Sequence, residues 1–142
     1  MSELPICRVS AGILRDEAGR VLIAQRPAGK HMAGWWEFPG GKAAPGESGA
    51  QALARELQEE LGVRAGHCER LLQIRHDYAD RIVELDVYRV ADFEGEPRSL
   101  EGQALRWVAI DSLAAERLLP ADRPILQALI RQSGEALAAG AQ

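Results

Sequence analysis

Three carboxylates lie within five positions of one segment, at Glu56, Glu59 and Glu60. If the segment is helical, Glu56 and Glu60 stand one turn apart, and their like charges destabilise the helix by about a few tenths of a kcal/mol unless a positive charge lies between them. An acidic surface in contact with water is one interpretation, and a bound divalent cation is the other. Oxygen ligands select hard ions such as Mg²⁺ or Mn²⁺, which commonly combine a few carboxylates with substrate phosphates.

The segment around these carboxylates has a helix signal at both ends. Ser48 with Gln51 three residues later forms the pattern of a capping box, and Gly62 supplies a stop, so we expect a helix over residues 49–61. Its apolar positions fall within one stripe, and the three carboxylates fall outside it. The stripe consists of Ala50, Leu53, Ala54, Leu57 and Leu61.

Two neighbouring features bear on the same chemistry. Arg55 follows Glu47 by two helical turns, so an ion pair between them would fix the preceding loop to the helix. The pair Gly40-Gly41 taken alone indicates an ordinary turn. Beside the helix carboxylates, a loop that contributes ligands is the better interpretation.

The rest of the chain is typical of a mixed α/β domain. Turn residues at 16–19 separate expected strands at 6–14 and 21–24, and a second turn at 77–80 separates strands at 71–75 and 81–90. A further strand is expected at 105–110, and the spacing of Ile125, Leu126, Leu129 and Ile130 indicates a closing amphipathic helix. The Gly- and Pro-rich stretch 27–49 is long enough to predict a functional loop. We expect one domain over residues 1–142, with a disordered tail at 133–142.

Composition excludes several classes of protein. The 142 residues are 46% hydrophobic and 27% charged, which is typical of a folded globular chain. Seventeen basic against 21 acidic residues give 17 − 21 = −4, so neither a nucleic acid polymer nor a membrane is an expected partner. Cys7 and Cys68 match no disulfide framework and are interpreted as packing residues in a reducing compartment. These features predict a cytoplasmic protein, and we expect it to be a monomer or a weak dimer.

One run of residues is far more specific than composition. It consists of Gly41, Glu47, Arg55, Glu56, Leu57, Glu59, Glu60, Gly62 and Val63. At every position this run resembles the signature of the Nudix hydrolase family, a coincidence expected at roughly one starting position in 10⁹. Further likeness to the MutT branch of that family extends over about residues 5 to 131. The resemblance implies an α/β/α sandwich with a mixed central β-sheet.

The resemblance also implies an activity, namely the Mg²⁺-dependent hydrolysis of 8-oxo-dGTP to 8-oxo-dGMP and pyrophosphate, with Mn²⁺ as an alternative metal. The implied metal ligands are Glu56, Glu59, Glu60, Glu101 and the backbone carbonyl of Gly40, and Arg55 is implied to organise them. The cations would bridge substrate phosphates and lower the pKa of an attacking water. The implied substrate-binding residues are Arg26, His31, Glu37, Phe38, Pro39, Gly40 and Asp122. Trp35 and Trp36 are interpreted as packing residues rather than as a platform for the base.

Asp122 is a departure from the pattern of the MutT branch, which has Asn there to read the oxidised purine. An amide can both donate to O6 and accept from the N7 hydrogen, whereas an ionised carboxylate only accepts. Asp122 therefore either holds a proton, contacts another base edge, or simply caps the last helix.

Two alternatives follow for the whole chain: a Nudix hydrolase for another nucleoside triphosphate or a dinucleotide, and a non-catalytic nucleotide-binding domain. The intact set of four Glu residues argues against the second.

Overall fold

The computed structural model describes residues 4–140 of the chain. They divide into two compact units. The first unit comprises the described parts of Met1–Leu14 and Phe38–Gly102, and the second comprises those of Arg15–Glu37 and Gln103–Gln142. The chain therefore passes between the units three times.

The first unit contains the predicted helix and most of the strands. Its elements are β1 (Ile6–Ile13), β4 (Gly40–Lys42), α1 (Gly49–Leu61), β5 (Arg64–Ala65), β6 (Cys68–Asp77), β7 (Ile82–Val90) and β8 (Phe93–Glu94). Four strands form one sheet in the order β4-β1-β7-β6. β1 and β7 run parallel and the other neighbours run antiparallel, so the sheet is mixed as expected. β5 and β8 pair separately.

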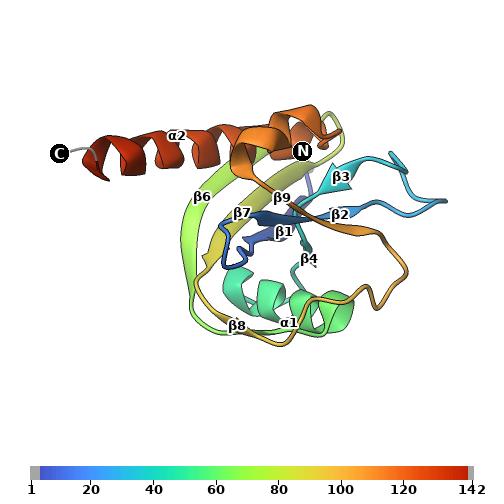
Figure 1. Ribbon diagram of the computed structural model, residues 1–142. Helices are drawn as coiled ribbons and strands as arrows, with labels where there is room; N and C mark the ends of the chain where they lie inside the picture. Colours follow the sequence, from blue (N-terminus) through green and yellow to red (C-terminus); the bar gives the residue numbers. More distant parts are fainter. Residues whose placement is uncertain (1–3, 141–142) are drawn as a thin grey trace. The chain divides into compact units, whose positions relative to one another are not determined.

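Helix α1 begins and ends where its caps predict. The backbone N–H of Gln51 donates to Ser48 Oγ over 3.1 Å, and the backbone N–H of Ser48 donates to Gln51 Oε1 over 2.9 Å. Gly62 ends the helix in the left-handed conformation, with φ of 69°. α1 packs on β1 and β4 (Figure 1). Together these contacts bury the leucine side of the helix, while Glu56 and Glu60 are half-buried and Glu59 is exposed.

The buried stripe of α1 differs slightly from the expected one. Leu53, Leu57 and Leu61 are buried as predicted, but Ala52 is buried instead of Ala50 and Ala54, which are only half-buried. The apolar stripe of a helix is more than 100° wide, and the leucines alone do not fix where its centre lies. The sequence therefore did not determine which alanines at its edges are buried.

The second unit contains a small antiparallel sheet and the C-terminal helix. Its elements are β2 (Val21–Gln25), β3 (Trp36–Glu37), β9 (Leu105–Val108), the 3₁₀ helices η1 (Ile110–Ala115) and η2 (Pro120–Asp122), and α2 (Arg123–Gly140). The strand order is β3-β2-β9. Ile125, Leu126 and Leu129 of α2 are buried, but Ile130 is 47% exposed. The closing amphipathic helix is thus confirmed with one apolar position facing water.

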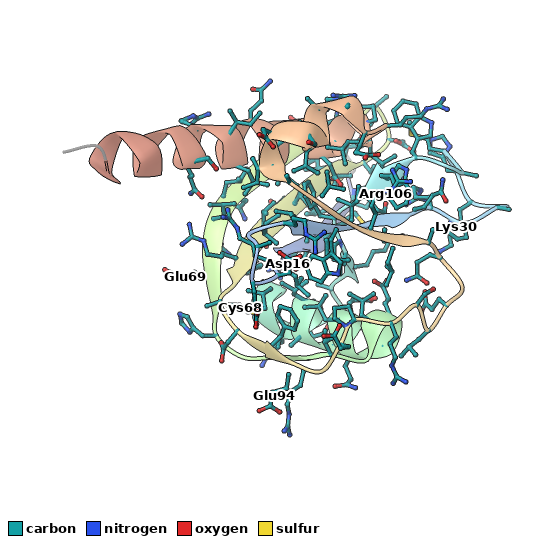
Figure 2. The ribbon with its side chains drawn as sticks, in the orientation of Figure 1. Asp16, Lys30, Cys68, Glu69, Glu94 and Arg106 are labelled. Carbon is teal, nitrogen blue, oxygen red and sulfur yellow. The ribbon has the colours of Figure 1, made fainter. Side chains whose placement is uncertain are left out.

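Several boundaries differ from the expected ones. The turn at Asp16 (labelled in Figure 2) is present, with the backbone N–H of Arg20 donating to Asp16 Oδ1 over 2.8 Å, but β1 and β2 belong to different sheets. The strand expected at 105–110 ends at Val108, and Ile110 begins η1. The long loop at 27–49 contains β3 and β4. α2 continues through residues 133–140, where the sequence predicted part of a disordered tail, and residues 141 and 142 lie outside the described part.

Candidate active site

The glycine pair of β4 packs closely against its surroundings in the first unit. Gly40 has φ of 157°, and a Cβ there would overlap the backbone carbonyl of Ser10. A Cβ on Gly41 would lie 2.7 Å from both carboxylate oxygens of Glu56. At Gly40 only glycine lets two backbone segments approach so closely, whereas the neighbour of Gly41 is the end of the flexible Glu56 side chain. The expected turn is therefore a place where the sheet backbone meets a carboxylate of α1.

Arg55 joins the carboxylates around this point. Its Nε and Nη2 donate to the two oxygens of Glu47 over 2.8 and 3.0 Å, which confirms the predicted ion pair. Its Nη1 donates to Glu56 Oε1 over 3.0 Å and to Glu59 Oε2 over 3.2 Å. Nη2 also donates to the carbonyl of Lys42 over 3.0 Å. One guanidinium thus binds β4, the loop after it and the acidic side of α1.

Glu47 fixes the loop between β4 and α1. One of its oxygens accepts the backbone N–H of Ala44 over 2.7 Å, and its own N–H donates to the carbonyl of Ala44 over 3.0 Å. Hydrogen bonds from Arg55, and then from the Ala44 backbone, lower the pKa of the Glu47 carboxyl from 4.5 to about 2. Hydrogen bonds to Glu47, and then to Glu56, raise the pKa of Arg55. The loop is thus fixed by charges that persist through the neutral range.

Glu60 and Glu101 are related through the C-terminal end of α1. The backbone N–H of Leu100 donates to the carbonyl of Glu60 over 3.0 Å, and that of Arg98 donates to the carbonyl of Leu61 over 2.9 Å. These bonds satisfy carbonyls that the helix itself leaves without partners. They place Glu101, an exposed residue, directly after the segment that is bonded to the end of α1.

In the second unit, Arg26 gathers two of the other predicted site residues. Its Nη1 donates to Glu37 Oε2 over 2.8 Å, and its Nε donates to the backbone carbonyl of His31 over 2.7 Å. The His31 side chain is exposed. Arg26 therefore shapes the loop between β2 and β3 with two of its nitrogens.

The remaining predicted substrate contacts are mostly buried. Phe38 and Pro39 lie in the core of the first unit, just before Gly40. Asp122 is 7% exposed and is the residue before α2 in the second unit. That place in the chain is compatible both with a helix cap and with a contact to a base.

The tryptophans have structural partners, as expected for packing residues. Trp36 is 7% exposed, and the guanidinium carbon of Arg106 (labelled in Figure 2) lies 4.4 Å from its ring centroid. Arg117 covers the half-buried Trp35 at the same distance. The cation–π contacts occupy a ring face of each indole within the second unit.

The residues of the first unit fit a hard divalent cation. Among residues 4–140, no three His, Cys, Asp or Glu side chains are already gathered as a metal ion would require. Yet the donors at hand are all oxygens, and Gly41 keeps the Glu56 carboxylate directly beside the β4 backbone. Arg55 supplies the counter-charge to Glu56 and Glu59 in this arrangement.

Comparison with known proteins decides the family. The model of the NUDIX domain matches residues 10–128, which span both units. The chain belongs to the Nudix family. A CTP pyrophosphohydrolase of Escherichia coli K12 is 44% identical over 86% of this chain and 89% of that protein. An 8-oxo-dGTP diphosphatase of the same organism is 38% identical over 87% and 96%.

A solved structure agrees with these relatives. A MutT structure from a study of the Aliivibrio salmonicida and Vibrio cholerae proteins has a TM-score of 0.79 and 35% identity, and covers 89% of this chain and 98% of that one. The α/β class and the resemblance to MutT are therefore confirmed. As a Nudix hydrolase, the chain belongs to a class of enzymes that generally need a divalent metal. No helix in the described part is long and apolar enough to cross a membrane.

Sequence analysis assigned no role to Asp86, whose side chain is 2% exposed. A signal was present, because Asp86 is a charged residue between two apolar positions of a strand, Leu85 and Val87, and acidic residues are almost never buried without partners.

Proposed function

We propose that this Nudix hydrolase cleaves a nucleoside triphosphate to the monophosphate and pyrophosphate, with 8-oxo-dGTP as the first candidate substrate. The observation that carries the proposal is the contact of Glu56 with Gly41, organised by Arg55 within the Nudix motif. Relatives named 8-oxo-dGTP diphosphatase, at 38% identity or more over most of the chain, support the substrate.

Mg²⁺, or Mn²⁺ in its place, is the proposed cofactor. Glu56, Glu59, Glu60 and Glu101, with the carbonyl of Gly40, would hold it. When bound, the cation would offset the negative charge of the phosphates and make an attacking water more acidic. If Glu56 and Glu59 leave Arg55 to bind the cation, the guanidinium still binds Glu47. The loop before α1 would therefore stay in place.

The chain's own residues carry the proton transfer and orientation. Water attacks the β-phosphorus, its proton passes to one carboxylate of this set, and the bond from the β-phosphorus to the bridging oxygen breaks. The electron pair leaves with the nucleoside monophosphate, and the attacking oxygen remains in pyrophosphate. Arg26 and His31 are proposed as contacts to the phosphates, Phe38 and Pro39 as contacts to the base, and Glu37 as a further contact to the substrate.

A cytosine nucleotide is the second candidate substrate. Asp122 is the observation that favours it, because an ionised carboxylate accepts from the N4 amino group of cytosine but cannot donate to O6 of a purine. The relative at 44% identity is named CTP pyrophosphohydrolase. Both candidates use the same phosphate chemistry and differ only in the base.

A product assay over a nucleotide panel tests the proposal. The panel contains 8-oxo-dGTP, dGTP, CTP and dCTP, each with Mg²⁺ and with EDTA. We expect pyrophosphate only in the presence of metal, with the highest kcat/KM for 8-oxo-dGTP. A higher value for CTP would select the second candidate, and turnover of none of the four would contradict a triphosphatase of this kind.

Hydrolysis in ¹⁸O-labelled water tests the position of attack. We expect the label in pyrophosphate, since the attacking oxygen stays on the β-phosphorus. Label in the monophosphate would show attack at the α-phosphorus, which contradicts the proposed step but not the Nudix assignment.

A further inference from the structure

A row of residues runs across all four strands of the first sheet on the side that faces α1. Gly41 of β4 is paired with Ser10 of β1, Ser10 with Asp86 of β7, and Asp86 with Gln73 of β6. Gly41 contacts Glu56, near the middle of α1. Ser10 and Asp86 lie beside Gly49 in the first turn of the same helix, so one row of the sheet meets α1 at two points.

The first turn of α1 meets this row through Gly49. Ser10 Oγ donates to the carbonyl of Gly49 over 2.8 Å. A Cβ on Gly49 would lie 3.0 Å from Asp86 Oδ2 and would overlap the hydroxyl of the buried Tyr88. A side chain at position 49 therefore fits only if the Tyr88 ring, the helix or the sheet moves. We call Ser10, Gln73, Asp86 and Tyr88 the helix seat.

Charges inside the seat are balanced by its neighbours. Gln73 Nε2 donates to Asp86 Oδ1 over 2.7 Å, and guanidinium nitrogens of Arg70 and Arg8 lie 3.6 and 3.9 Å from the carboxylate. The first turn of α1 carries no acidic residue of its own. The carboxylate of Asp86 thus supplies from the sheet the negative charge that favours a helix N-terminus.

We propose that Asp86 and the other seat residues are positioning residues for the metal-binding carboxylates, an inference that rests on the proposed function. The reason is the close approach at the second contact, where the Glu56 carboxylate lies beside Gly41. A small displacement of α1 at Gly49 moves Glu56 relative to the β4 backbone. The seat holds no metal ligand and acts only through the placement of α1.

The affinity of the protein for Mn²⁺, measured by titration calorimetry without substrate, tests the proposal. Gly49→Ala is expected to raise the Kd for Mn²⁺ by about tenfold or more, as loss of groups that support metal ligands typically does. Saturating Mn²⁺ should restore most of kcat, since every ligand remains. The matched control is Gly134→Ala on α2, where a Cβ meets nothing within 4 Å, and its Kd should be unchanged.

Three further variants keep the test decisive if Gly49→Ala does not fold. Ser10→Ala removes only the hydroxyl bond to Gly49 and should raise the Kd severalfold. Asp86→Asn keeps an acceptor for Gln73, so its Kd should lie between those of Asp86→Ala and the wild type. If the folded seat variants bind Mn²⁺ as tightly as wild type while Glu56→Gln binds weakly, the seat is merely structural and the inference is wrong. If Glu56→Gln also binds normally, the metal-site proposal itself fails.

Discussion

Glu56 is the residue at which the constraints of the site meet. Its carboxylate lies against Gly41, accepts a hydrogen bond from Arg55, and is one helical turn from Glu60. Each of these contacts suits a carboxylate that alternates between an arginine and a cation. Loss of its charge should therefore affect turnover far more than folding.

We expect Glu56→Gln and Glu60→Gln each to lower kcat/KM by at least about a hundredfold, because each swap is nearly isosteric but deletes a charge that we propose to bind the metal. Steady-state kinetics at saturating Mg²⁺ with circular dichroism measures both activity and fold. Glu94→Gln is the control, since Glu94 is 81% exposed and lies on β8. Near-normal turnover of both site variants would refute the metal-site assignment.

Asp122 controls the choice of base if the base binds as the resemblance implies. Asp122→Asn restores a donor for O6 and keeps an acceptor for the N7 hydrogen. One hydrogen bond of this kind contributes about 1 to 3 kcal/mol, so the preference for 8-oxo-dGTP over dGTP should rise roughly five- to a hundredfold. Competition assays with the two nucleotides measure the ratio. An unchanged ratio would mean that Asp122 only caps α2.

Elements with local signals were the predictable part of the fold. Both ends of α1 followed from Ser48, Gln51 and Gly62, because a capping box and a left-handed glycine act within a few residues of the helix end. The Glu47 to Arg55 ion pair was predictable from their positions at the end of the loop and two turns into the helix, although the turn at Ala44 is what directs Glu47 toward Arg55.

Pairing between distant segments was not predictable. No local sequence signal predicts that β1 runs parallel to β7, some 75 residues later, or that β1 and β2 belong to different sheets. The short strands β3 and β4 lie in a stretch dominated by Gly and Pro, which masks strand propensity. Because the helix seat depends on these pairings, Ser10 and Asp86 could not be assigned from the sequence.

The loop between β4 and α1 should loosen in acid. The folded pKa of Glu47, about 2, lies below its ordinary 4.5, so the ion pair with Arg55 contributes fully above pH about 4.5 and is lost as pH falls toward 2. We compare urea midpoints of wild type and Glu47→Gln across this range. Their difference should shrink steadily below pH about 4.5. A constant difference would show that Glu47 contributes through something other than its charge.

At the scale of the whole molecule, we expect the acidic side of α1 to link binding of the proposed metal to stability. The chain has a net charge of −4, and Arg55 alone bridges Glu47, Glu56 and Glu59. A cation that binds only the folded protein adds stability according to its concentration relative to Kd. The same carboxylates that serve the reaction should therefore set how far the metal shifts unfolding.

We expect Mn²⁺ at a hundred times its Kd to add about 2.7 kcal/mol of stability and to raise Tm by roughly 5–10 °C relative to EDTA. Differential scanning calorimetry at constant ionic strength measures the shift in Tm. The Mn²⁺ and EDTA samples contain no Ca²⁺ and equal chloride, so that general screening of the acidic residues is the same in both. Glu56→Gln should lose most of the shift, because one ligand of the cation is gone. Glu94→Gln should keep it, because removing an exposed charge on β8 leaves the ligands intact. An equal Tm shift in both variants would mean that Mn²⁺ acts through the general charge of the protein. That result would contradict a metal site on α1.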